Sequence, residues 1–200
     1  MGKIRFSFFL IFTFLLFHVS FATFSFMNVA VAQESSITPL TIVTEAPIIK
    51  QNVNYDLPYP GLLPDHPLYK LKALRDKIIG FLISSVLKKA EFNLLQADKR
   101  LNAGVYLFNS KKTDLAITTI SKAENYFHQA IAEIGKANNQ GIDTRSLTEK
   151  LLDASKKHQE IISSLEKRSK GNTAESLVRE LERAEDFEKQ AIRLLSKKSK

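Results

Sequence analysis

Apolar residues recur at alternating spacings of three and four along most of the chain that follows Pro67. Such spacing puts them on one face of an α-helix and therefore predicts helices throughout this region. Five stripes can be read, with Phe187 beside the last: Leu68, Leu71, Leu74 and Ile78; Leu87, Ala90, Leu94, Ala97, Leu101 and Phe108; Ala116, Ile120, Ala123, Phe127, Ala130 and Ile134; Leu147, Leu151, Ala154, His158, Ile161 and Leu165; and Leu177, Leu181, Ala184, Ala191 and Leu195. Helices with stripes of this kind pack side by side at shallow angles. We therefore predict an all-α fold, an elongated antiparallel helical bundle or a set of coiled-coil-like helical hairpins, after an extended N-terminal segment.

The breaks between the stripes contain residues that are common at helix ends. They lie at Gly80 or Ser84-Ser85, at residues 109–113, at Gly141 with Asp143 or Thr144 as the next cap, and at Gly171 with Asn172. We expect Gly141 to adopt the left-handed conformation that ends many helices. The connecting segments are short, so neighbouring helices are expected to run antiparallel.

A proline-rich segment, residues 55–66, precedes the first helix, and we call it the strap. Proline has no N–H to offer a helix, and its fixed φ suits the first helical position. We therefore expect Pro67 to begin the helix, with His66 as the N-cap residue and Asp65 just outside, near the positive end of the helix dipole. The first apolar stripe and the strap side chains are expected to pack on the bundle. These strap side chains are Tyr55, Leu57, Tyr59, Leu62 and Leu63.

The stretch LPYPGLLPDHPLYKLKALRDKI, residues 57–78, resembles the signature of an exported bacterial family known only as a domain of unknown function. The matching residues are Leu63, Pro64, Asp65, Pro67, Leu68, Tyr69, Leu71, Lys72, Arg75 and Asp76, followed by Lys112, Asp114 and Ala116 in a K-x-D-x-A helix start. The resemblance covers residues 55–138. It implies an extracytoplasmic helical domain and supplies no catalytic residues. The second helix departs from the family pattern, and residues 143–198 add a helical pair outside it.

The N-terminus has the pattern of an export signal. A basic start is followed by the apolar run FSFFLIFTFLLF, residues 6–17, and by the small-x-small site Ala30-Val31-Ala32. We expect cleavage after Ala32 by the machinery that handles Sec-type signals. An uncleaved signal anchor is the alternative, because residues 6–32 are long enough to cross a bilayer. In both cases the remainder is expected to be extracytoplasmic, either secreted or associated with the cell envelope.

These observations divide the chain into four predicted regions. Residues 1–32 are the signal peptide or anchor, and 33–54 form a flexible linker. Residues 55–140 form a family-like helical domain with its strap, and 141–200 form a C-terminal helical hairpin that packs on it.

The composition excludes some kinds of stabilisation and disfavours a nucleic-acid-binding protein. The chain has no cysteine, so disulfides and lipid attachment through a cysteine are excluded and stability has to come from packing. The formal net charge is +8, but the basic residues are interleaved with acidic ones along every predicted helix. This pattern favours a solvated surface over a nucleic-acid interface. A one-sign cluster forms only at the C-terminal end, at Arg193 and the lysines at 197, 198 and 200.

The sequence offers few residues for catalysis. His66, His128 and His158 have no close metal-ligand spacing, and no phosphate-binding loop or nucleophile elbow occurs. We expect no catalytic, cofactor-binding or metal-binding residues. His158 lies in an apolar stripe, where it is expected to bond to a neighbouring polar residue, the alternative being a pH-sensitive core position. His128 is expected to face water.

Tyr55, Tyr59 and Tyr69 bracket the strap, and two interpretations of them remain open. They form a surface that grips an extended peptide or a glycan, or they cover the end of the bundle. The sequence indicates no other candidate partner-binding residues.

The leading prediction is a non-enzymatic exported helical domain that binds a protein or an envelope polymer, or serves as a structural part of the cell envelope. One alternative is an envelope stress sensor or chaperone-like holdase, which would use apolar residues outside the strict stripes: Ile117, Ile131, Leu152, Ile162 and Val178. Another is a weak binder of anionic wall polymer or membrane surface. Contact with a membrane is otherwise expected only through an uncleaved N-terminal segment.

Overall fold

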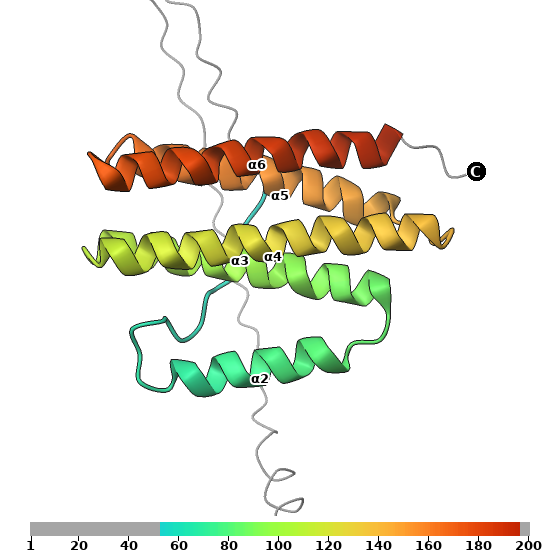
Figure 1. The fold of residues 1–200 in the computed structure, drawn as a ribbon, viewed down its shortest axis with the longest axis horizontal. Helices are drawn as coiled ribbons and strands as arrows, with labels where there is room; N and C mark the ends of the chain where they lie inside the picture. Colours follow the sequence, from blue (N-terminus) through green and yellow to red (C-terminus); the bar gives the residue numbers. More distant parts are fainter. Residues whose placement is uncertain (1–52, 197–200) are drawn as a thin grey trace, which may run out of the picture. The chain divides into compact units, whose positions relative to one another are not determined.

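The computed structural model describes residues 53–196, which form five α-helices and no strand (Figure 1). The helices are α2 (Tyr69–Leu82), α3 (Val86–Asn109), α4 (Thr113–Asn139), α5 (Arg145–Glu166) and α6 (Asn172–Ser196). The predicted all-α class is confirmed. The expected signal at residues 1–32, almost all of the linker, and the lysines at 197, 198 and 200 lie outside the described residues. None of the helices within 53–196 combines the length and apolarity needed to cross a bilayer.

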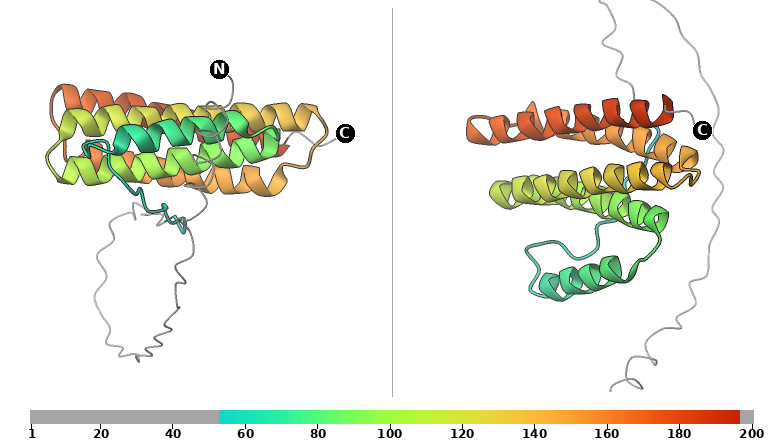
Figure 2. Two further views of the ribbon diagram at one scale, coloured as in Figure 1. Left: turned by 90° about the horizontal axis from the view of Figure 1, so that it is seen from below. Right: turned by 45° about the vertical axis from the view of Figure 1, so that its right-hand side comes forward.

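Two helical hairpins stack on one another. Helices α3 and α4 form one antiparallel pair, and α5 and α6 form the other, with α4 facing α6 and α3 facing α5. Figure 2 shows the same layers from two further directions, with α2 on the outer side of the α3–α4 layer. Helix α2 makes few contacts with α3. The bundle proper is therefore four-helical, and α2 lies against its flank.

The stripes predicted for α3 to α6 form the hydrophobic core. Every residue of the third stripe, from Ala116 to Ile134, is buried, and so are most residues of the second, fourth and fifth stripes. One cluster joins side chains of all four helices around Phe127, which stacks on Phe187 with ring centroids 5.0 Å apart. Burying a side chain of this size contributes roughly 1.5–3 kcal/mol. The core thus joins the region before residue 140 to the region after it.

Several predicted helix ends also hold, although α5 ends at Glu166, five residues before Gly171. Ser85 caps α3, since its side chain accepts a hydrogen bond from the Lys88 backbone N–H. Gly141 follows α4 with φ +74°, the left-handed conformation expected there. Before α5 the Asp143 carboxylate accepts from the Arg145 N–H, and α6 begins at Asn172 as predicted.

The expected start of the first helix is wrong by two residues. Helix α2 begins at Tyr69, with Leu68 in the N-cap position, whereas Pro67 and Leu68 form a turn. The reason is that the His66 carbonyl accepts from the Tyr69 N–H, three residues on, which makes a turn instead of a first α-helical bond. The His66 ring nitrogen Nδ1 does accept from the Leu68 N–H. Asp65 forms an ion pair with Lys112 at the start of α4, with 2.5 Å between Oδ2 and Nζ. Its carboxylate therefore contacts the start of α4 and not the start of α2.

The expected docking of the first stripe is also wrong. Leu68, Leu71, Leu74 and Ile78 are all more than half exposed. The buried residue of α2 is Asp76, and Gly80 lies against the Phe92 ring of α3. Helix α2 therefore turns its narrow, polar side to the bundle and its broad apolar side away from it.

The strap follows its prediction in part. Tyr55 and Leu57 pack on the two core clusters, as expected. Tyr59 and Leu62 are exposed, contrary to expectation. Backbone carbonyls anchor this part of the strap instead: Pro58 O accepts from Asn102, and Pro60 O accepts from Lys72.

Candidate functional site

A buried histidine joins three helices at the centre of the bundle. His158 of α5 is fully buried, and its two ring nitrogens face two carboxylates. Nδ1 lies 2.8 Å from Glu124 Oε1 of α4, and Nε2 lies 3.1 Å from Asp98 Oδ1 of α3. The Phe127 ring meets the imidazole edge-on at 4.9 Å between centroids. The prediction that His158 bonds to a neighbouring polar residue is confirmed.

The two carboxylates decide the charge of the histidine. Burial on its own lowers the pKa of His158, but the negative charges and hydrogen bonds of Glu124 and Asp98 outweigh it and raise this pKa to about 9. A carboxylate at each nitrogen requires both nitrogens to carry a proton, which is the imidazolium form. The centre of the bundle thus contains a protonated histidine between two acids at neutral pH.

The strap completes this arrangement. The Tyr55 hydroxyl donates to Asp98 Oδ2 at 2.6 Å, so both oxygens of Asp98 are engaged. Burial, followed by the nearby charge of Asp98, raises the pKa of Tyr55 and keeps the phenol protonated. Glu124 Oε2 is buried and has no hydrogen-bond partner among the described residues. We call these four residues the Tyr55–Asp98–His158–Glu124 network.

A pocket of about 320 Å³ adjoins the network at its outer end. Asn54, the strap, α3 and α5 supply its lining; the residues after Asn54 are Tyr55, Asp56, Pro58, Glu91, Leu94, Leu95, Asp98, Leu147 and Lys150. Two network residues, Tyr55 and Asp98, therefore face both the pocket and the core. His158 and Glu124 do not line it.

This geometry suits a structural link better than a catalytic one. His158 has both nitrogens engaged, so it has no free position for accepting a proton from a substrate or for binding a metal. Tyr55 stays protonated and donates to Asp98, which leaves neither group free as a base. Within residues 53–196 no group of three His, Asp or Glu side chains is placed to hold a metal ion.

The sequence did not reveal the partners of His158. Asp98 lies four residues after Leu94 and three before Leu101, and Glu124 lies four after Ile120 and three before Phe127. Each carboxylate thus lies three or four residues from core residues of its own helix, on the same face as the apolar stripe. Acidic residues at such positions on two neighbouring helices could have indicated an ion pair with the histidine in the stripe of α5.

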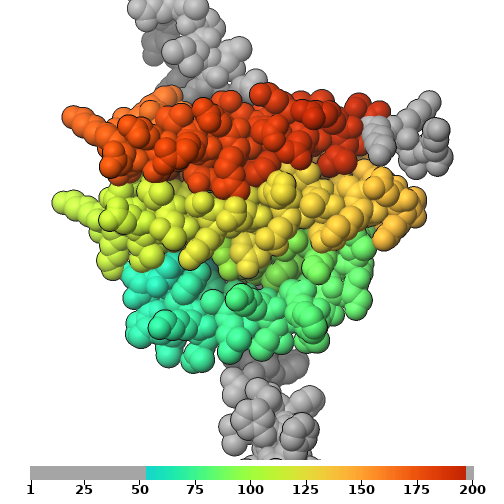
Figure 3. Space-filling model, viewed as in Figure 1, coloured from blue at the N-terminus to red at the C-terminus, as the bar shows by residue number. Residues whose placement is uncertain are grey.

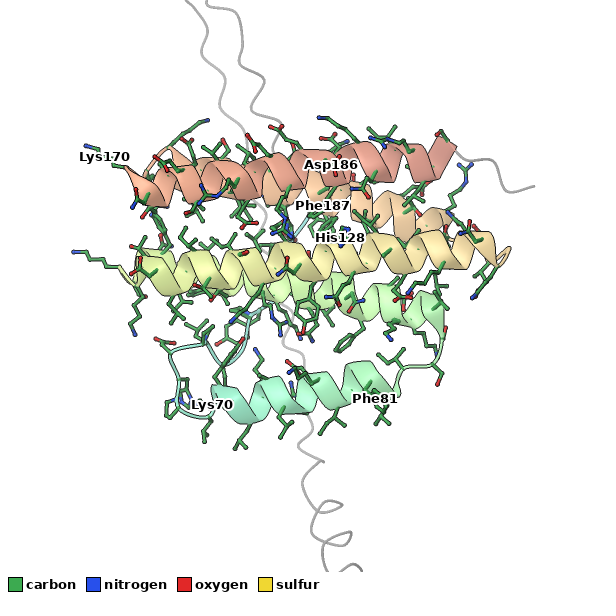
Figure 4. All side chains as sticks on the ribbon, in the orientation of Figure 1. Lys70, Phe81, His128, Lys170, Asp186 and Phe187 are labelled. Atoms are coloured by element: carbon green, nitrogen blue, oxygen red, sulfur yellow. The ribbon has the colours of Figure 1, made fainter. Side chains whose placement is uncertain are left out.

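The other residues singled out from the sequence do not form one site. Tyr55 belongs to the buried network, Tyr59 is exposed, and Tyr69 is half-buried with the Lys72 ammonium 5.7 Å from its ring centroid. His128 is exposed, as expected, and lies beside Phe187 (Figure 4). Helix-start residues 65–67 are exposed.

A second candidate site is the outward side of α2, which we call the α2 apolar face. It consists of Leu71, Leu74, Ile78, Phe81 and Leu82. All five are more than half exposed, and Phe81 is 86% exposed. Figure 3 shows α2 at one edge of the bundle, and Figure 4 shows Phe81 pointing away from the other helices.

Comparison with known proteins places the chain in a family. Residues 61–172, more than half of the chain, match the model of the DUF5667 family, a domain of unknown function, and the protein belongs to this family. The match extends past residue 138, where the resemblance noted above ends, and takes in all of α5. No curated protein and no solved structure matches the chain.

Proposed function

We propose that this protein is an exported, non-enzymatic interaction module of the bacterial cell envelope and that the α2 apolar face is its binding surface. The observation that carries the proposal is the exposure of five large apolar side chains on one side of one helix. Contiguous apolar surface of this kind marks interaction sites in soluble domains.

The bundle does not need this face for its own stability. The core of α3 to α6 is closed by its own side chains, with Leu101, Ile120, Phe127 and Ile134 fully buried. Helix α2 contributes only Asp76 to the buried residues. Leaving five large apolar residues in water forgoes stabilisation, which is compensated when a partner covers them.

Polar contacts hold α2 in place from its inner side. Lys72 donates to the carbonyls of Pro60 and Leu62 in the strap, at 2.6 and 3.1 Å. The pair between Arg75 and Asp76, at 2.8 Å, stays within α2. The two Lys72 bonds therefore tie the helix to the strap without using its apolar side.

Export and envelope location are supported by the sequence pattern of residues 1–32. The non-enzymatic class is supported by the closed Tyr55–Asp98–His158–Glu124 network. Of the residues that the holdase alternative would use, Ile131 and Ile162 are buried, Ile117 and Leu152 pack on the core, and Val178 is 39% exposed.

Site-specific crosslinking tests the proposal. A photoreactive residue replaces Ile78 on the α2 apolar face, and a control carries it at Ile192, which is equally exposed on α6. After irradiation in an envelope preparation, we expect adducts from position 78 and few or none from position 192. Equal labelling at both positions would contradict the proposal. Catalytic turnover that Asp98→Asn abolishes would contradict the non-enzymatic class.

A further inference from the structure

We propose that the α2 apolar face docks on an anionic membrane surface, with α2 lying in the plane of the headgroups. This inference rests on the proposed function, in which the α2 apolar face is the binding surface, and it names the partner. The argument starts from the distribution of charge around α2.

Positive charge flanks the α2 apolar face on both edges. On a helical projection at 3.6 residues per turn, Lys70 and Lys77 lie along one edge, beside Phe81 and Leu74. Arg75 lies along the other edge of the five face residues, beside Leu82, with its side chain 66% exposed and its guanidinium paired with Asp76. The 41% exposed Ile79 lies beyond it. A central apolar stripe between two cationic edges is the pattern of helices that lie in a membrane interface.

Negative charge is kept away from this surface. The one acidic residue of α2 is Asp76, which is buried on the opposite side of the helix and paired with Arg75. The lysines at 70 and 77 are exposed and no acid on α2 faces them. The outward side of α2 is therefore purely cationic and apolar, which complements anionic lipid headgroups over acyl chains.

The dimensions agree with docking along the surface. Helix α2 has 14 residues and is therefore about 21 Å long, too short to cross a bilayer. Because α2 lies at one edge of the bundle, with α5 and α6 on the far side of α3 and α4, a membrane can meet it without a clash with those helices (Figures 1 and 3).

Two other occupants fit less well. A second copy that docked face to face would bring the Lys70, Lys77 and Arg75 edges of both copies together, which costs electrostatic free energy. The apolar run at residues 6–17 of the same chain carries no acidic residue, so it could cover the stripe but not complement the two edges.

The absence of cysteine makes a direct test simple in the full-length chain. Phe81→Cys receives an environment-sensitive fluorophore, and Ile192→Cys, at a half-exposed apolar position on α6, is the control. Each protein is mixed with phosphatidylcholine vesicles that contain or lack phosphatidylglycerol. The fluorophore senses the surroundings of its own helix, so its signal is independent of any anchoring through residues 1–32.

We expect a blue shift and quenching by brominated acyl chains at position 81 with the anionic vesicles, and neither at position 192. Adding Lys70→Gln and Lys77→Gln to the position-81 protein should weaken its vesicle titration roughly 30-fold, since each charge near an anionic surface contributes about fivefold. No shift at position 81, or the same shift without phosphatidylglycerol, overturns the inference.

Other outcomes separate the inference from the proposed function. A blue shift without vesicles that grows with protein concentration identifies a second copy as the occupant, and a shift independent of concentration identifies the chain itself. Both overturn membrane docking. If position 81 stays silent with vesicles while the photoreactive residue at Ile78 crosslinks to an envelope protein, the inference fails and the proposed function stands.

Discussion

At the scale of single residues, His158 is the position where sequence and structure inform each other most. Its place in an apolar stripe predicts a buried, hydrogen-bonded histidine, and the structure shows this. The identity of its partners depends on how three helices are rotated against each other. A stripe fixes which face of a helix is buried but not which residue of the next helix it meets, so Asp98 and Glu124 could not be assigned from spacing alone.

The raised pKa of His158 predicts a specific pH dependence of stability. A group whose pKa is higher in the folded state than in the unfolded state stabilises the fold when protonated. For His158 this contribution is complete below about pH 6.5, the value of an unperturbed histidine, and is lost as the pH rises through about 9. We expect the free energy of unfolding to fall by a few kcal/mol across this window.

Denaturant unfolding at a series of pH values measures this dependence. In His158→Gln the decline between pH 6.5 and 9 should disappear. A decline of the same size in wild type and variant would show that His158 does not carry the charge between Asp98 and Glu124.

Gly104 of α3 lies in close contact with Ile120 of α4. A Cβ atom at this position would lie 2.4 Å from Ile120 Cγ1. Gly104→Ala should therefore force the helices apart and destabilise the protein by about 1–3 kcal/mol.

Gly135 provides a matched control on α4, because a Cβ atom there meets nothing within 4 Å. Gly135→Ala should stabilise the helix by up to about 1 kcal/mol, since alanine is the better helix former. The melting temperatures of the two variants should move in opposite directions. A shift of the same sign in both would mean that the α3–α4 spacing is not set at Gly104.

At the scale of helices, periodicity predicted four stripes correctly and misplaced one. The stripes of α3 to α6 form the core, and the breaks at Ser85, Gly141 and Asn172 hold. Helix α2 has an equally regular stripe that faces outward. Periodicity shows that a helix has an apolar side. It does not show which element, if any, covers that side, because this depends on how the helices pack together.

The contrast between α2 and the other helices can be tested by the same change at two places. Leu94→Asp puts an unpaired charge into the core, where it should cost about 3–5 kcal/mol and unfold most of the molecule. Phe127→Asp should behave in the same way. Leu74→Asp, on the exposed α2 face, should change stability by less than about 0.5 kcal/mol.

Far-UV circular dichroism during thermal unfolding measures this comparison. The assignment of the faces would be wrong if Leu74→Asp lowered the melting temperature as much as Leu94→Asp does. It would also be wrong if Phe127→Asp melted like the wild type.

At the scale of the whole molecule, the strap connects the N-terminal part of the chain to the buried centre. Tyr55 bonds to Asp98, Asn102 bonds to the Pro58 carbonyl, and Lys72 bonds to the Pro60 carbonyl. The prolines predicted an extended strap, but the polar residues that receive it belong to distant parts of the sequence. These long-range contacts could be established only from the folded structure.

Two internal deletions measure what the strap contributes. Deleting residues 33–54 removes the linker and leaves Tyr55, Leu57 and the carbonyl anchors in place. Among the described contacts, this deletion loses the 3.3 Å bond from the Val53 N–H to Glu160 and the 2.8 Å bond from the Tyr55 N–H to the Val53 carbonyl, so little stability should be lost. Deleting residues 33–66 also removes Tyr55, and Asp98 then retains a buried oxygen without its donor, at a cost of about 1–3 kcal/mol. The apolar area that Tyr55 and Leu57 bury is lost as well, at roughly 25 cal/mol per Å². The longer deletion should therefore lower the denaturant midpoint clearly more than the shorter one.

The deciding control is Tyr55→Phe in the full chain, which keeps the ring on the core and removes only the hydroxyl. It should fall between the two deletions. Equal midpoints for both deletions, with Tyr55→Phe unchanged, would show that the strap lies on the bundle without stabilising it. A partner that binds residues 55–66 would then have to explain the prolines of the strap.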